Sequence, residues 1–287
     1  MRKLLLLSIL CPVVAFSQQR FHVTLFGGLS NYAGDLQDHQ FTLQQSNFAF
    51  GAGLKYDLTP NFALRVAFTH GSIEGDDKKS KDAALRARNL SFFSKINEGS
   101  LLLEYTLLNL EERRFSPFIY GGLTVFHFNP YAYDSLGNKV FLKPLSTEGQ
   151  GIDPDRKPYK LTQFAIPVGF GVKFRISDNT VLAYEVSVRK TLTDYLDDVS
   201  STYFDKTELA AARGLKAVEM AYRGGEVKGG NTTYPDGGSI RGGSKYKDWY
   251  YFTGFTLYIG LGSGNGGGSP FGHTRGGRNQ LGCPKVL

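Results

Sequence analysis

The sequence predicts an all-β protein, an eight-stranded antiparallel β-barrel that crosses a membrane with its strands. Three features support this fold class: a two-residue hydrophobic period, the alternation of short and long connectors, and the confinement of charge to one face. The period is clearest over residues 161–176. Side chains alternate between the faces of a strand, so one face of this segment is apolar and the other small or charged. The apolar face carries Phe164, Ile166, Val168, Phe170, Val172, Phe174 and Ile176.

Eight segments show this pattern. Their connectors are short after the second, fourth and sixth segments and long after the others, which is typical of bacterial outer-membrane barrels. In the last segment, Leu257 and Ile259 are expected to face lipid, with Tyr250, Tyr251 and Phe252 near the membrane interface. The predicted strands are residues 20–33, 47–58, 61–73, 90–108, 117–129, 161–176, 180–192 and 248–262.

The charged face distinguishes a membrane barrel from a soluble one. An arginine facing lipid at the bilayer midplane costs about 2 to 4 kcal/mol, so the charged faces must line the lumen. A lumen of eight strands is only wide enough to be filled by side chains, and the acids and bases can neutralise one another there. We therefore predict a plugged barrel with a charge network formed by Lys55, Arg65, Glu104, Lys173, Arg175, Glu185 and Arg189.

The first residues predict the compartment. Residues 1–17 carry Arg2 and Lys3, then an apolar stretch, then Ala15 and Ser17 at the spacing of a signal-peptidase site. We expect a signal peptide over 1–17, Sec export, and an integral outer-membrane barrel over 18–262. Cys11 is a poor lipidation site because Leu10 is bulky and Pro12 follows. With an even number of strands, both termini are expected in the periplasm and the long loops outside the cell.

The last residues, 263–287, form a glycine-rich stretch that we expect to be a periplasmic tail. It carries Cys283, the one thiol expected in the mature chain. An unpaired cysteine in an oxidising compartment suggests either a free thiol or a disulfide to another chain. Both alternatives remain open.

The longest loop, 193–247, contains a candidate helix over residues 205–223. Asp205 and Glu208 have the spacing of a capping box, and Gly214 weakens the prediction. We expect one amphipathic helix covering the barrel mouth, with a buried stripe formed by Leu209, Ala212, Leu215, Val218 and Tyr222.

Candidate chemistry is sparse, so we predict no enzyme, cofactor, metal, nucleic-acid partner or small-molecule substrate. Asp194, Asp197 and Asp198 lack the spacing of a calcium loop and are interpreted as a solvated strand end. Ser187 and His127 lie on different strands, with nothing to join them as a catalytic pair. The formal charge of +7 falls to about +5 without Arg2 and Lys3 and forms no basic stripe.

Five stretches resemble the PorG family of the type IX secretion system, outer-membrane barrels of the Bacteroidota. They are "NYAGDL" (31–36), "LKPLSTEGQG" (142–151), "DRKPYKLTQFAIPVGFGVKF" (155–174), "RKTLTDYLDDVSSTY" (189–203) and "DWYYFTGFTL" (248–257). The resemblance covers about residues 20–262. It implies a non-enzymatic structural role in type IX secretion and gliding motility, with no catalytic residue or cofactor.

The partners that the resemblance implies are a periplasmic ring lipoprotein (PorK- or GldK-like) and its ring partner (PorN- or GldN-like). The barrel would anchor or position that ring at the outer membrane, and Cys283 could bond to the lipoprotein. Membrane lipids and lipopolysaccharide are further expected partners of any such barrel. The alternative hypothesis is a small outer-membrane barrel of ligand-binding or solute-conducting type, unrelated to secretion.

Overall fold

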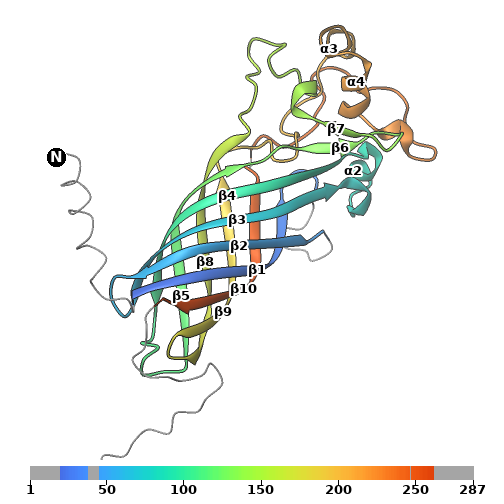
Figure 1. Cartoon of the computed structure of the whole chain (residues 1–287). Coiled ribbons are helices and arrows are strands. Elements are labelled where there is room, and N and C mark those ends of the chain that lie inside the picture. Colours follow the sequence, from blue (N-terminus) through green and yellow to red (C-terminus); the bar gives the residue numbers. More distant parts are fainter. Residues whose placement is uncertain (1–19, 38–44, 246, 262–287) are drawn as a thin grey trace, which may run out of the picture.

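The computed structural model describes residues 20–37, 45–245 and 247–261, and within them eight long strands close into an antiparallel barrel (Figure 1). Each strand pairs with its neighbours along the chain, and β10 pairs with β1 to close the ring. The eight predicted segments and the predicted fold class are confirmed. The barrel strands are β1 (Phe21–Ala33), β2 (Asn47–Asp57), β3 (Phe62–Asp76), β4 (Ser91–Thr106), β5 (Phe115–His127), β8 (Thr162–Ser177), β9 (Thr180–Thr191) and β10 (Trp249–Gly260).

The connectors alternate in length as the sequence predicts. Short turns join β2 to β3, β4 to β5 and β8 to β9 at one end of the barrel. The connections after β1, β3, β5 and β9 lie at the other end (Figure 1). The predicted signal peptide, 1–17, and the tail, 263–287 with Cys283, lie outside the described residues.

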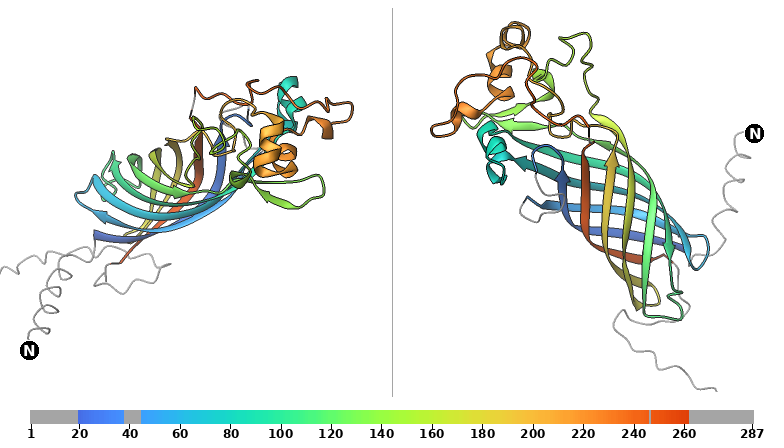
Figure 2. Two further views of the ribbon diagram at one scale, coloured as in Figure 1. Left: turned by 90° about the horizontal axis from the view of Figure 1, so that it is seen from above. Right: turned by 180° about the vertical axis from the view of Figure 1, so that it is seen from behind.

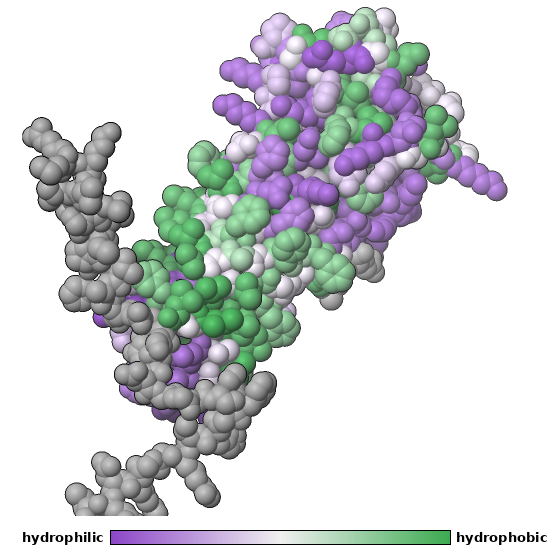
Figure 3. Space-filling view, in the orientation of Figure 1, coloured by the Kyte–Doolittle hydropathy of each residue, from purple (hydrophilic) through white to green (hydrophobic). Residues whose placement is uncertain are grey.

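An apolar belt surrounds the barrel. In β8, Phe164 and Phe170 are 61% and 62% exposed, and β2, β3, β4 and β5 expose the corresponding apolar side chains (Figure 3). Such a surface on a closed barrel matches acyl chains and not water. The protein is therefore an outer-membrane type β-barrel. Among the helices of the described residues, none has both the length and the apolar composition needed to cross a membrane.

Glycines allow the first and last strands to approach closely. Gly28 of β1 lies opposite Gly254 of β10, and a Cβ on Gly28 would overlap the carbonyl oxygen of Thr253. A side chain at this position must push the two strands apart. A Cβ on neighbouring Gly27, in contrast, would meet nothing within 4 Å.

We expect Gly28→Ala to destabilise the barrel by about 1 to 3 kcal/mol, because overpacking separates the strands that close the ring. Gly27→Ala is the matched control and should have little effect. The measurement is the urea midpoint of unfolding in detergent micelles. Equal midpoints for the two variants would contradict the close approach.

The long connections fold together into a cap over one mouth of the barrel (Figure 2). A hairpin of β6 (Tyr131–Tyr133) and β7 (Lys139–Phe141) extends the sheet beyond β4. The pattern of the sequence does not predict this hairpin. The other elements of the cap are η3 (Asp77–Lys79), α2 (Ala83–Arg88), η4 (Lys143–Leu145), α3 (Lys206–Arg213), α4 (Leu215–Ala221) and η5 (Gly224–Glu226).

The predicted helix over 205–223 is wrong in one respect, because it is two helices. Asp205 caps α3 as expected, accepting hydrogen bonds from the backbone N–H groups of Thr207 and Glu208. Gly214 then adopts a left-handed φ of +82° and ends the helix. Two residues of the predicted buried stripe do not face the core: Ala212, near the end of α3, is exposed, and Leu215, directly after the break, is 78% exposed.

An aromatic core joins the barrel to the cap. The rings of Phe126 and Tyr250 lie 5.2 Å apart, and Tyr32 packs edge-on against Phe92 at 4.9 Å. Tyr250 and Phe252 thus point into the barrel, which corrects the expectation that they lie at the membrane interface. They alternate with Trp249 and Phe255, which face outward. Tyr251 lies on that outward face too but is only 6% exposed, so the two-residue period is confirmed while the interface placement is wrong for Tyr250 and Phe252.

Candidate functional site: the barrel interior and the cap

The middle of the barrel holds one group of buried ion pairs. Arg65 donates to Glu185 at 3.2 Å and lies 3.8 Å from Glu104. Lys173 donates to Glu104 and, at 2.8 Å, to Thr106 Oγ1. Tyr258 links the pairs, because its hydroxyl accepts from Arg65 at 2.9 Å and donates to Glu104 at 3.1 Å.

A second group lies nearer the cap. Arg189 donates to both carboxylate oxygens of Glu98, at 2.8 and 3.2 Å, and Tyr250 donates to Glu98 at 2.8 Å. The guanidinium of Arg189 also stacks 4.5 Å from the ring of Phe252. Such a two-oxygen contact with a planar guanidinium fixes the geometry of both side chains.

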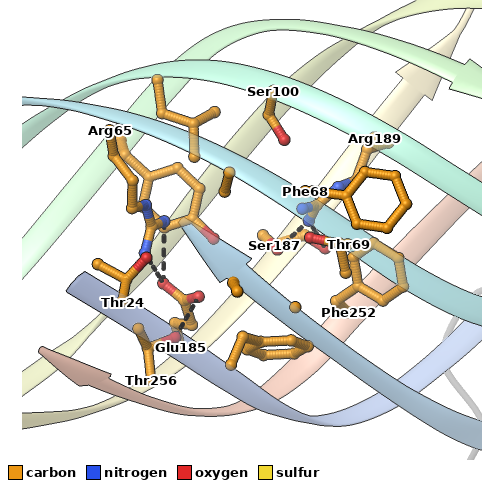
Figure 4. Close-up of a pocket in the computed structure, with 16 residues that line it drawn as sticks. Thr24, Arg65, Phe68, Thr69, Ser100, Glu185, Ser187, Arg189, Phe252 and Thr256 are labelled. Atoms are coloured by element: carbon orange, nitrogen blue, oxygen red, sulfur yellow. Dashed lines mark hydrogen bonds and ion pairs between the residues drawn. The ribbon is translucent and has the colours of Figure 1, made fainter. Parts of the chain in front are cut away.

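The two groups together close the lumen. Three bases, Arg65, Lys173 and Arg189, face three acids, Glu98, Glu104 and Glu185, and all six are at most 5% exposed. The pocket between the groups has a volume of about 30 Å³, lined by side chains from both (Figure 4). That volume holds about one or two water molecules. The interior is thus filled and charge-balanced.

Five of the seven predicted network residues lie in these two groups: Arg65, Glu104, Lys173, Glu185 and Arg189. Lys55 lies toward the short-turn end, where it pairs with Asp57 at 2.8 Å. Asp57 also contacts His22 at 2.6 Å. Lys55 thus borders the groups without a direct ion pair to them.

The prediction that Arg175 belongs to the charge network of the lumen is wrong. Its nearest carboxylate is that of exposed Asp178, 3.9 Å away in the β8–β9 turn, and its side chain is 30% exposed. Arg175 lies on the same face of β8 as Lys173, but two residues further along, where the strand has already left the lumen. Glu98, in contrast, was missed although it lies on the same face of β4 as Glu104.

The centre of the cap is Glu148, which is completely buried. Its carboxylate accepts from Arg241 at 2.9 Å, and from the backbone N–H groups of Ser200 and Ser201 at 3.0 Å each. Arg241 further donates to the backbone carbonyls of Asp198 and Ala221, at 2.6 and 3.2 Å. One buried ion pair therefore joins four parts of the chain within the cap: residue 148, residues 198–201, residue 221 and residue 241.

Beside Glu148 lies an acid cluster formed by Asp35, Asp194, Asp197, Asp198 and Asp248. Asp194, Asp197 and Asp198 are at most 3% exposed, so their interpretation as a solvated strand end is wrong. Tyr32 donates to Asp197, and Tyr159 donates to Asp198 at 2.7 Å. Burial raises the pKa of Asp194 and of Asp198 to about 6. Burial and neighbouring carboxylates raise the pKa values of Asp197 and Asp248 well above the ordinary range.

Comparison with known proteins gives a family for this chain. A family model described as a domain of unknown function, DUF6089, matches residues 1–211. The chain belongs to the DUF6089 family. Among curated proteins, none matches its sequence.

Several solved structures are similar in shape. Neisserial surface protein A is 9% identical, with a TM-score of 0.43, covering 85% of this chain and 97% of its own. OprG from Pseudomonas aeruginosa is 11% identical, with a TM-score of 0.40, covering 84% of this chain and 97% of its own. Ail of Yersinia pestis is 8% identical, with a TM-score of 0.38, covering 84% of this chain and 98% of its own.

We expect the cap to lose stability as pH rises from about 4 to 7. A carboxyl group with a raised pKa binds its proton more tightly in the folded cap than in the unfolded chain. Its stabilisation is therefore present below the unfolded value of 3.8 and lost as pH rises through about 6. The expected loss is roughly 1 to 3 kcal/mol.

Amide hydrogen exchange of residues 192–203, corrected for the intrinsic effect of pH, measures this change. Asp194→Asn should reduce the pH dependence, because it removes one of the titrating carboxyl groups, and Asp194→Asn/Asp198→Asn should reduce it further. Protection that increases toward neutral pH would contradict the assignment.

The structure does not bring the remaining candidates together. Ser187 Oγ accepts from Arg189 inside the barrel, whereas His127 lies outside and contacts Thr162 at 3.1 Å. Of the other four histidines in the sequence, His22 and His70 are far apart along β1 and β3, and His39 and His273 lie outside the described residues. Across the described ranges, no three His, Cys, Asp or Glu side chains are grouped so that they could hold a metal ion.

Proposed function

We propose that this protein is a non-conducting, non-enzymatic outer-membrane barrel that presents its cap at the cell surface as a rigid binding platform. The main support for this proposal is the contrast between the barrel and the cap. The lumen is filled by balanced ion pairs around a pocket of about 30 Å³. The cap, in contrast, is a folded unit with its own buried centre at Glu148. A filled barrel is suited to anchoring and not to transport.

The lengths of the connectors indicate which end of the barrel faces the periplasm and which faces the medium. Outer-membrane barrels carry short turns in the periplasm and long loops outside. Residues 20 and 261 lie at the short-turn end, where Leu261 donates a backbone hydrogen bond of 2.8 Å to Phe21. The cap would then face the medium, after export by the Sec route that the signal peptide predicts.

Planar-bilayer recording tests the anchor function. The wild-type protein should give no current steps above the baseline, because the buried ion pairs and aromatic side chains of the described residues fill the middle of the barrel. Arg65→Ala/Glu185→Ala removes one buried pair together with its large side chains, and should give measurable leakage if it still closes as a barrel. Stable steps from the wild-type protein would instead favour a solute channel.

A second candidate function is the type IX secretion role that the resemblance to the PorG family implies. One observation favours it: segments that carry the resemblance meet in the cap. Residues 31–36, 142–151 and 189–203 supply Tyr32, Glu148 and Asp197, which lie in the same buried region. The other two segments, 155–174 and 248–257, lie mainly on β8 and β10, so the resemblance covers both the cap and the barrel.

The secretion role makes its own prediction about partners. A tagged protein should co-purify with a PorK- or GldK-like ring lipoprotein and with its PorN- or GldN-like partner. If Cys283 forms the proposed disulfide, a higher-mass band on non-reducing gels should disappear in Cys283→Ser. A ring-free preparation from cells that assemble the ring would exclude this role and leave the surface platform.

A further inference from the structure

An exposed aromatic surface lies on the hairpin that extends the barrel sheet beside the cap. It is formed by Phe93 of β4, Tyr131 and Tyr133 of β6, and Phe141 of β7. Phe93 stacks on Tyr131 at 5.7 Å and meets Tyr133 at 5.6 Å, while Phe141 lies 6.0 Å from Tyr131. We call these four rings the aromatic ladder.

The ladder faces outward because of the strand register. Phe93 pairs with Tyr131, and Tyr131 with Phe141, so the three side chains share a face. The opposite face of the hairpin presents Ala132 and Val140, which pack on the core of the cap. Tyr133 and Phe141 remain 43% and 42% exposed. Figure 2 shows the hairpin projecting beside the barrel mouth.

Two lysines make the same face positively charged. Lys139 Nζ lies 3.7 Å from the centre of the Tyr131 ring and 4.8 Å from that of Phe141. Lys95 is exposed two residues after Phe93, on the same face of β4. Glu74, the acid opposite Phe93, pairs with Lys79 at 3.3 Å. Within the described part of the chain, no carboxylate pairs with Lys95 or Lys139.

This face continues the apolar belt. Along β4 the outward positions run from Phe93 through Lys95, Asn97 and Gly99 to the exposed Leu101 and Leu103. At about 3.3 Å per residue, Lys95 lies about 20 Å along the strand from Leu101, and less in height because barrel strands are tilted. The ladder and its lysines therefore lie at the depth where lipid headgroups begin.

We propose that the aromatic ladder, with Lys95 and Lys139, binds the phosphorylated saccharide headgroup of an outer-leaflet glycolipid. Aromatic rings offer apolar faces to sugar rings at a wet interface, and lysine ammonium groups attract phosphates as point charges. The lipid contact of the belt would thus extend upward onto the extramembrane sheet. The surface would orient the barrel and hold the cap against the outer leaflet.

Binding of fluorescent lipopolysaccharide to the detergent-solubilised full chain tests the proposal. Lys95→Glu/Lys139→Glu should weaken binding by about tenfold or more. Each basic residue near an anionic lipid surface adds to the binding free energy, and the substitution by glutamate adds repulsion. Tyr131→Ser/Tyr133→Ser should weaken it too, without a change in charge. Unfolding temperatures measured in phosphatidylcholine nanodiscs show whether each variant still folds.

The matched control is Lys206→Glu/Lys228→Glu, which makes the same charge change at exposed positions elsewhere on the cap. This control should retain wild-type binding. An equal loss in the control would show non-specific attraction and would overturn the proposal. Equal binding of a lipopolysaccharide from which the phosphates have been removed would overturn it as well.

Discussion

Replacing Glu98 with glutamine is expected to lower the free energy of unfolding by about 3 to 5 kcal/mol. Glu98 is fully buried and accepts from Arg189 and Tyr250. Glutamine fills the same space but removes the charge that neutralises the guanidinium. Breaking one side of a buried ion pair leaves an uncompensated charge, which costs much more than the pair itself contributes. Reversible urea unfolding in lipid vesicles measures the loss.

Two further variants separate the effect of the lost charge on stability from the effect of altered packing. Glu98→Gln/Arg189→Met removes both charges and should recover much of the lost stability, because well-packed apolar groups can replace a buried pair. Arg175→Met, at the pair that lies outside the lumen, should change stability little. A Glu98→Gln barrel as stable as the wild type would show that Arg189 does not depend on this carboxylate.

The second large effect is expected in the cap. Glu148→Ala removes the acceptor of the buried Arg241 and of two backbone N–H groups, that of Ser200, which is buried, and that of Ser201, which is partly buried. Unsatisfied buried groups of this kind cost several kcal/mol. Because the loss concerns the cap alone, amide protons of residues 194–202 should exchange about 100 to 1,000 times faster, while the barrel strands keep their protection.

Glu219→Gln is the control for the cap, since Glu219 pairs with Lys216 on the surface at 2.6 Å. Its exchange pattern should match that of the wild-type protein. Faster exchange in the barrel strands of Glu148→Ala would mean that cap and barrel unfold as one unit, which contradicts a separate centre at Glu148.

The barrel could be predicted from the sequence because each strand carries its own signal. Phe164 and Phe170 face lipid and Lys173 faces the lumen by simple alternation, which requires no knowledge of the neighbouring strands. The limits of a strand are less clear. Arg175 continues the alternation of β8 but lies where the strand leaves the barrel, so its partner is a turn residue.

The cap could not be predicted, because its contacts join segments that are far apart in the chain. Asp197 and Asp198 look like solvated acids in sequence, and only their contacts with Tyr32 and Tyr159 explain their burial. Glu148 has no local pattern that distinguishes it from a loop glutamate. Glu98 is different. It lies six residues before Glu104, so the alternation along the strand places both side chains on the lumen face, and Glu98 could have been predicted as a member of the charge network.

The most direct test is to measure which face of the barrel strands contacts lipid. Trp249 is the only tryptophan, so Trp249→Phe gives a background for single probes. Phe170→Trp places a probe at a 62% exposed position in the belt, and Phe118→Trp places one at a 1% exposed position facing the lumen on the neighbouring strand. In vesicles of brominated lipid, the probe at 170 should be strongly quenched and the probe at 118 much less. Equal quenching, or stronger quenching at 118, would contradict a barrel with an apolar exterior and a filled, charged interior.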